Sequence, residues 1–206
     1  AIKAKGGQGI FVSTNLRQKE DVENLKQVTL DTYGTVTTLA NCAGILVHKP
    51  FLDHTDGDYD KISETNFRAY IWTMQAFLPV MLENPEQCSV VNIASISSIK
   101  PETNAYFYGA FKAAVDLMTR NLTREFSPQG IRLNVICPGP VDTNMTPLEV
   151  KNSPEIQAAM CKNVCSIGRL GQPIDIAYAA TYLCSDEASW VTGAHFVIDG
   201  GACMMG

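Results

Sequence analysis

The sequence predicts a single α/β domain in which helices cover both faces of a doubly wound parallel sheet. Short β-rich runs alternate with long segments of helical periodicity along the 206 residues, as expected for parallel strands joined by crossover helices. A chain of this length can bury a sizeable core. Its 46% hydrophobic and 18% charged residues are ordinary for a globular domain, and no repeat or low-complexity linker divides it.

Periodicity and turn residues set the expected bounds of each element. Val22, Leu25 and Val28 recur at helical spacing, and Gly34 follows as a helix end. The segment 141–170 is expected to be irregular, with one or two short helices. In chain order, the expected strands are 10–13, 36–40, 89–94, 131–137 and 195–198, and the expected helices are 19–33, 58–82, 106–126 and 174–184.

Polar motifs follow three of these strands at their carboxyl ends. They are Asn41, Ser95 and the pair Pro138-Gly139. In an open parallel sheet, ligands bind beyond the carboxyl ends of the strands. Three separate segments therefore predict one crevice.

Composition excludes several other classes of protein. A net charge of −5 argues against a nucleic-acid partner, which requires a basic face. No apolar run reaches the ~20 residues of a membrane helix, so no membrane partner is expected. The seven cysteines are scattered and odd in number, which favours reduced thiols in a cytoplasmic protein. Cys161 and Cys165 lie four apart without a nearby histidine, so no metal site is expected.

Tyr108 and Lys112 are suited to proton transfer. Four residues apart on a helix, they lie on the same face. A tyrosine has an ordinary pKa of about 10, and a cation beside it lowers that pKa by favouring the phenolate. The pair could thus exchange a proton with an alcohol or carbonyl oxygen. A core tyrosine followed by a solvated lysine would show the same spacing.

Two further polar residues fit this chemistry. Ser95 follows a strand and could hydrogen-bond the same substrate oxygen. Ser97 and Ser98 compete for that role, or simply form the turn. Asn66 lies in the middle of an expected helix, where asparagine is unfavourable. It either holds a water molecule that serves Lys112 or occupies an exposed polar position.

These residues, together with several motifs, resemble the short-chain dehydrogenase/reductase family. Residues 41–44 resemble its Asn-Asn-Ala-Gly motif, with Cys42 in place of the second asparagine, and residues 138–143 resemble its Pro-Gly loop. Residues 168–173 and 191–201 match further along, so the resemblance covers essentially the whole chain. The residues that resemble the catalytic tetrad are Asn66, Ser95, Tyr108 and Lys112.

The resemblance implies an oxidoreductase that uses NADP or NAD to interconvert an alcohol and a ketone or aldehyde. Tyr108 would be the general acid or base, and Lys112 would lower its pKa and bind the nicotinamide ribose. Ser95 would orient the substrate carbonyl, and Asn66 would anchor a water molecule. The implied cofactor contacts are Asn15, Asn41, Ala43, Gly44, Tyr108, Lys112, Pro138, Gly139, Val141 and Thr143.

The resemblance also implies the partners of the protein. The substrate would be a small-molecule carbonyl or alcohol. The two long helices would pack against a second subunit, giving a homodimer or homotetramer.

The family's Rossmann-like fold, a three-layer αβα arrangement, begins with a β-α-β unit that we do not find here. Its glycine-rich turn holds the pyrophosphate at a helix N-terminus. Residues 6–9 are glycine-rich, but they precede an expected strand instead of following one. We therefore expect 1–206 to be a partial domain of a longer enzyme.

Without that unit, the strand at 36–40 would be a bare edge, which is an aggregation hazard. Isolated 1–206 should then be unstable or rearranged. The alternative is a truncated, non-catalytic relative of the family that acts as an interaction partner of a full-length subunit.

Overall fold

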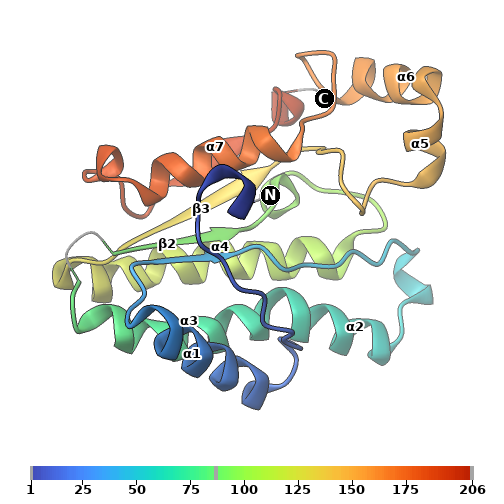
Figure 1. Ribbon diagram of the computed structural model, residues 1–206. Coiled ribbons are helices and arrows are strands. Elements are labelled where there is room, and N and C mark those ends of the chain that lie inside the picture. The colour runs from blue at the N-terminus through green and yellow to red at the C-terminus, as the bar shows by residue number, and fades with distance from the viewer. Residues whose placement is uncertain (1, 86–87, 205–206) are drawn as a thin grey trace.

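A four-stranded parallel sheet forms the centre of the protein. The computed structural model describes residues 2–85 and 88–204. The strands lie in the order β1-β2-β3-β4, so each crossover carries the chain to the adjacent strand (Figure 1). The register pairs Asn41 with Asn92 and Val135 with His195. The strands are β1 Thr38–Asn41, β2 Ser89–Ile93, β3 Arg132–Pro138 and β4 His195–Ile198.

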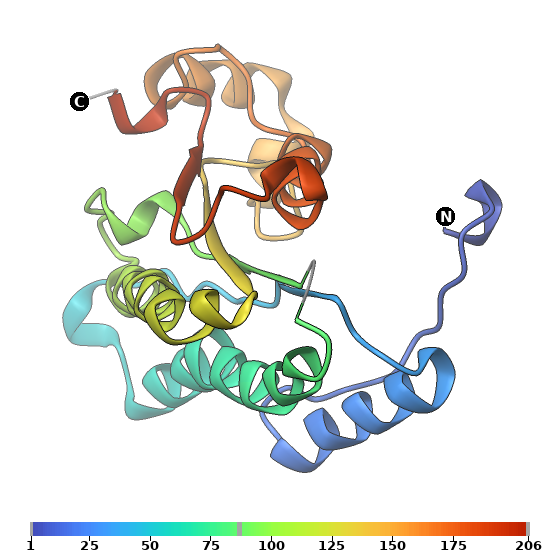
Figure 2. The ribbon, with the colours of Figure 1, turned by 90° about the vertical axis from the view of Figure 1, so that its left-hand side faces the viewer.

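Helices cover both faces of the sheet, which confirms the predicted α/β class. Figure 2 shows α3 and α4 against one face, with α1 beside α3, and α7 against the other face. The helices are α1 Lys19–Tyr33, α2 Asp56–Ser63, α3 Ala69–Leu82, α4 Tyr106–Phe126, α5 Leu148–Asn152, α6 Pro154–Val164 and α7 Pro173–Cys184. Within the described residues, none of them combines the length and the apolarity needed to cross a membrane.

Alternating strand residues build a core on each face of the sheet. Val90 and Leu133 point toward α3 and α4, where they pack in a large cluster with Met74, Leu78 and Val115. Their strand neighbours Val91 and Ile136 point the other way and pack against Leu183 of α7. This alternation is the period-two geometry of strands that are buried on both faces.

The helix predicted at 58–82 is interrupted, so that prediction is wrong in detail. Helix α2 begins at Asp56, because Thr55 and Asp58 form a reciprocal capping box. A single π-helical turn, Glu64–Arg68, then separates α2 from α3. Such wide turns are frequent at functional sites, and this one contains Asn66. The predicted helix at 19–33 is confirmed, and Gly34 ends it with a φ of 78°.

The strand predicted at 10–13 is wrong. The segment is irregular, and Phe11 is 91% exposed. A strand exists only where a neighbouring backbone completes its hydrogen bonds. Among the described residues, no strand lies beside 10–13 to complete these hydrogen bonds, and the segment runs away from the sheet (Figure 2).

Candidate active site

The carboxyl ends of the first three strands meet at one edge of the sheet. The Ala94 amide, just beyond β2, donates to the Ile136 carbonyl of β3 at 2.8 Å. The Tyr70 hydroxyl donates to the carbonyls of Ala43, after β1, and of Ile93, at the end of β2, at 2.9 and 3.1 Å. Backbone and side-chain bonds thus join the three segments that we predicted to form one crevice.

Lys112 lies beneath this edge as a buried cation. Its side chain reaches from α4, and the residue is only 3% exposed. The ammonium donates to the Ile93 carbonyl at 2.7 Å and to the Tyr70 hydroxyl at 3.4 Å. Burial lowers the pKa of Lys112 to about 8, although Cys42 and Cys137 act in the opposite direction. Lys112 is therefore fixed in position, and it loses its proton at a lower pH than a solvated lysine does.

Tyr70 was not among the residues that we selected from the sequence. It is buried, and burial raises the pKa of its phenol far above the ordinary value. It therefore stays neutral and accepts a hydrogen bond from the Lys112 ammonium. Tyr70 follows Asn66 by four residues, which places the two side chains on one helix face. This spacing is the sequence signal that could have identified Tyr70.

Asn66 anchors the loop that follows β1. It is fully buried, and its amide exchanges two bonds of 2.8 Å with the backbone N–H and C=O of Ile45. A Cβ added at Gly44 would lie 3.4 Å from the Lys112 Nζ and 3.6 Å from the Asn66 Oδ1. Gly44, Asn66 and Lys112 therefore surround one point, and a side chain at position 44 would cover the ammonium.

Ser95 and Tyr108 form the outer part of the site. Burial is the largest influence on the Tyr108 phenol and raises its pKa above the ordinary value, although the Ser95 side chain acts in the opposite direction. The Lys112 Nζ lies 5.9 Å from the Tyr108 ring centre, and the expected effect of Lys112 on this pKa stays a prediction. In this structure the phenol is therefore the protonated form that a general acid needs.

Asn41 lies at the base of the crevice with its side chain turned into the protein. Its amide donates to the Asn92 Oδ1 and accepts from the Thr73 hydroxyl, both at 2.8 Å. Asn92 in turn donates to the Thr119 hydroxyl at 2.8 Å. This buried polar ladder ties β1 and β2 to α3 and α4. Asn92 was missed from the sequence, because a single asparagine in an apolar strand does not reveal its partners.

The loop after β3 is held against β4. The Gly139 amide donates to the Ile198 carbonyl at 2.9 Å, and a Cβ at Gly139 would lie 2.6 Å from the Asp199 Cα. Only glycine allows this approach. Pro138 ends β3, and Val141 forms a bridge with Gly171.

Two predicted cofactor contacts are engaged locally. The Thr143 hydroxyl accepts from the Met145 amide at 3.2 Å. Asn15 is exposed ahead of α1, where its side-chain oxygen accepts from the Arg17 amide at 3.1 Å. Among the described residues, no hydrogen bond joins Thr143 or Asn15 to Ser95, Tyr108 or Lys112. Their roles stay predictions.

The residues present fit one end of a nicotinamide dinucleotide. A buried ammonium beside a glycine and a carbonyl-rich edge suits ribose hydroxyls, which both donate and accept hydrogen bonds. For the pyrophosphate, no glycine-rich turn in the described residues follows a strand and opens a helix. Gly7, in the glycine-rich segment 6–9, instead packs on Ile2, where an added Cβ would lie 2.9 Å from the Ile2 Cγ2.

Comparisons with known proteins find related sequences over nearly the whole chain. The family model described as enoyl-(acyl carrier protein) reductase matches residues 1–203. A 2,5-dichloro-2,5-cyclohexadiene-1,4-diol dehydrogenase of Sphingobium indicum is 32% identical over 200 residues, covering 97% of this chain and 78% of the relative. The dehydrogenase/reductase SDR family member 6 of Xenopus laevis is 34% identical, covering 91% and 76%.

A solved structure shows the same fold. A dehydrogenase/reductase from Sinorhizobium meliloti 1021 superposes with a TM-score of 0.88 at 29% identity, covering 97% of this chain and 77% of that chain. The parallel sheet and its helices are therefore shared with solved dehydrogenases.

Proposed function

The chain belongs to the short-chain dehydrogenase/reductase family, and from this premise we propose that it interconverts an alcohol and a ketone or aldehyde with NADP or NAD. The observation that carries the proposal is the arrangement of Ser95, Tyr108 and Lys112. Two hydroxyls lie at the carboxyl edge of the sheet, and a buried ammonium lies beneath them.

Each of these side chains has a distinct task. Tyr108 gives a proton to the carbonyl oxygen in reduction and takes it back in oxidation. Ser95 donates to the same oxygen and stabilises the charge that develops there. Lys112 and Asn66 fix the floor of the site around Gly44, where the nicotinamide ribose would bind. A bound nicotinamide supplies or accepts the hydride.

The names of the relatives favour a hydroxyl or carbonyl substrate over a carbon–carbon double bond. The family model's description refers to an enoyl reductase. The relatives from Sphingobium and Xanthomonas, however, are named as dehydrogenases of a diol and of 2-keto-3-deoxy-L-fuconate. A tyrosine beside a serine hydroxyl suits proton transfer to an oxygen atom.

Substitution of Tyr108 tests the function. Tyr108→Phe should lower kcat by about 10²- to 10⁴-fold, the usual contribution of a general acid–base group. It should leave NAD(P)H binding, measured by cofactor fluorescence, unchanged. Tyr106→Phe is the matched control, because Tyr106 lies on the same helix but is exposed. Equal activity of the two variants, or a protein that binds no NAD(P)H, would contradict the proposal and favour a non-catalytic interaction partner.

We also propose that the protein assembles as a homodimer or homotetramer through α2 and α4. Exposed aromatic side chains gather where these elements meet. Tyr59 contacts Phe107 and Phe111 with ring centres 5.4 Å apart, and Phe51 contacts Tyr106 at the same distance. Light scattering of the wild type and of Tyr59→Lys measures the number of subunits. A monomeric wild type would contradict the proposed assembly.

A further inference from the structure

Two hydrogen bonds join Ser95 to an exposed carboxylate. The Ser95 hydroxyl donates to the Ser97 hydroxyl at 3.1 Å, and the Ser97 hydroxyl donates to the Glu102 Oε2 at 2.6 Å. Burial has the largest effect on the pKa of the Tyr108 phenol, and the charge of Glu102 raises that pKa further. The Glu102 carboxylate therefore lies close to the two residues that would bind the substrate oxygen.

The loop that carries Ser97 and Glu102 is fixed at both ends. At its beginning it packs directly on α4, since a Cβ added at Gly109 would lie 2.9 Å from the Ser97 carbonyl oxygen. At its end, Asn104 has a φ of 65°, a left-handed conformation that asparagine tolerates. The Asn104 carbonyl accepts from the Lys49 amide at 2.9 Å. The two side chains therefore have defined positions beside the helix.

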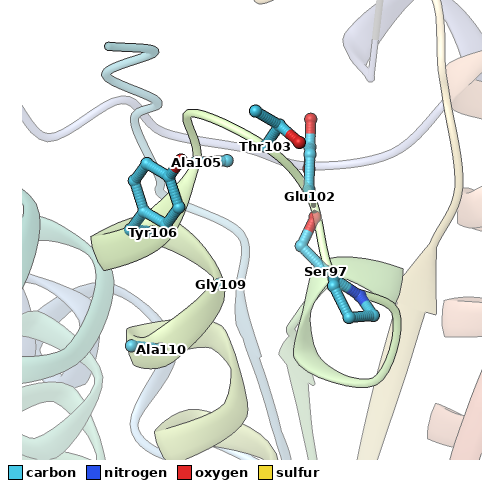
Figure 3. Close-up of a pocket in the computed structure, with 8 residues that line it drawn as sticks. Ser97, Glu102, Thr103, Ala105, Tyr106, Gly109 and Ala110 are labelled. Carbon is cyan, nitrogen blue, oxygen red and sulfur yellow. Dashed lines mark hydrogen bonds between the residues drawn. The ribbon is translucent and has the colours of Figure 1, made fainter. Parts of the chain in front are cut away.

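Ser97 and Glu102 line a pocket beside the first turns of α4 (Figure 3). The pocket has a volume of about 300 Å³, which is at the lower end of the range for ligand pockets and suits one part of a small molecule. Ser97 both bonds the Ser95 hydroxyl and lines this pocket. The pocket therefore adjoins the candidate active site.

The directions of these hydrogen bonds make Ser97 and Glu102 acceptors. The Ser97 hydroxyl has one proton, which it donates to Glu102, so its oxygen can otherwise only accept. An ionised carboxylate also only accepts. When the Ser95 hydroxyl turns its proton to a substrate oxygen, the Ser97 oxygen loses the bond from Ser95 and is available to another donor. The pair therefore favours a ligand group that donates, and it disfavours a carboxylate or a second carbonyl.

We propose that Ser97 and Glu102 form a subsite for a second hydroxyl group of the substrate, so that the protein prefers a diol or polyol to a simple alcohol. This inference rests on the proposed function, which places the reacting oxygen at Ser95 and Tyr108. A hydroxyl on a carbon next to the reacting carbon would then donate to the Ser97 oxygen or to the Glu102 carboxylate.

Two alcohols of similar size test the subsite. The trans isomers of 1,2-cyclohexanediol and 2-methylcyclohexanol share the ring and the reacting hydroxyl, but a methyl group replaces the second hydroxyl. Wild type should oxidise the diol with a kcat/KM about 10- to 100-fold higher, the range for a hydrogen bond to a charged group. Glu102→Met, which removes the acceptor, should lower this preference about tenfold or more. Glu102→Gln, which keeps an acceptor oxygen without the charge, should lower it less.

The ratio of the two alcohols isolates the subsite from other effects of Glu102. Both alcohols react at the same oxygen, so an influence of Glu102 on Tyr108 cancels in the ratio. Glu125→Met is the matched control and should leave the ratio unchanged, because Glu125 is an exposed carboxylate at the far end of α4. Ser97→Ala should lower the ratio, whereas Ser97→Thr, which retains a hydroxyl, should keep it. Equal ratios in wild type and Glu102→Met, or faster oxidation of trans-2-aminocyclohexanol than of the diol, overturn the subsite.

Binding measured without turnover separates the subsite from the proposed function. An NMR titration of the protein saturated with NAD(P)H gives the dissociation constant of each alcohol, and the diol should bind more tightly to wild type than to Glu102→Met. Oxidation of both alcohols in a ratio that Glu102→Met does not change contradicts only the subsite. Binding of the diol that depends on Glu102, without oxidation, contradicts only the proposed function. A protein that neither binds nor oxidises either alcohol contradicts both.

Discussion

The two faces of the sheet are packed to different degrees. On the face toward α3 and α4, strand residues such as Val90 and Leu133 are fully buried in a large cluster. On the other face, α7 covers β2 and β3, whereas Thr38 and Ala40 of β1 are exposed. Lys112, Asn66 and the asparagine ladder all belong to the densely packed face. The buried polar groups of the candidate site therefore lie on the face where close packing holds each side chain in one position.

Two buried asparagines offer the largest contrast between the faces. Asn92 points toward α3 and α4 and bonds Asn41 and Thr119. Asn134 points the other way and bonds the backbone of Val191 and Ala194. Asn92→Ala should lower the free energy of unfolding by about 3 kcal/mol, because it leaves buried partners unsatisfied and a cavity.

Asn134→Ala should cost about 1 to 2 kcal/mol, because its half-buried partners can bond water instead. Urea denaturation of both variants measures the contrast. A larger loss for Asn134→Ala would show that the face toward α7 is the better packed one.

Two adjacent valines of β2 test the same difference in packing between the faces, with a smaller expected effect on stability. Val90 and Val91 are both fully buried, but they belong to opposite faces. Val90→Ala should lower the free energy of unfolding by about 2.5 kcal/mol and Val91→Ala by about 1.5 kcal/mol. The reason is that a cavity costs more where the surroundings cannot collapse. Equal losses in thermal denaturation would mean that α7 packs as tightly as α3 and α4.

The pH dependence of stability tests the burial of Lys112. Its pKa falls from the ordinary 10.5 to about 8 in the folded protein. Between these values the unfolded chain binds a proton that the folded chain has released, so folding stability rises with pH. Wild type should therefore gain stability relative to Lys112→Met between pH 8 and pH 10, since other groups cancel in the difference. A constant difference across this range would place Lys112 in a solvated position.

Strong local sequence patterns were sufficient to predict most of the fold. The helices at Lys19–Tyr33 and Tyr106–Phe126 agree with their predicted bounds, because long periodic segments with clear ends leave little choice. The predicted strand at 10–13 failed, because a strand needs a neighbour that no local pattern guarantees. The π-helical turn at Asn66 was also missed, since it depends on the bonds of Asn66 with Ile45 in another segment.

The sequence by itself determined the α/β class, the alternation of strands and helices, and the family to which Ser95, Tyr108 and Lys112 point. The class and the alternation follow from periodicity, which is a local property of the chain, and the family follows from the resemblance of the motifs around these residues. Only the tertiary structure decided that Tyr70 supports Lys112, that Asn41 joins a buried ladder, and that Ser97 connects Ser95 with Glu102. The physical reason is that a hydrogen bond requires two groups at about 3 Å, and the packing of distant segments alone sets that distance.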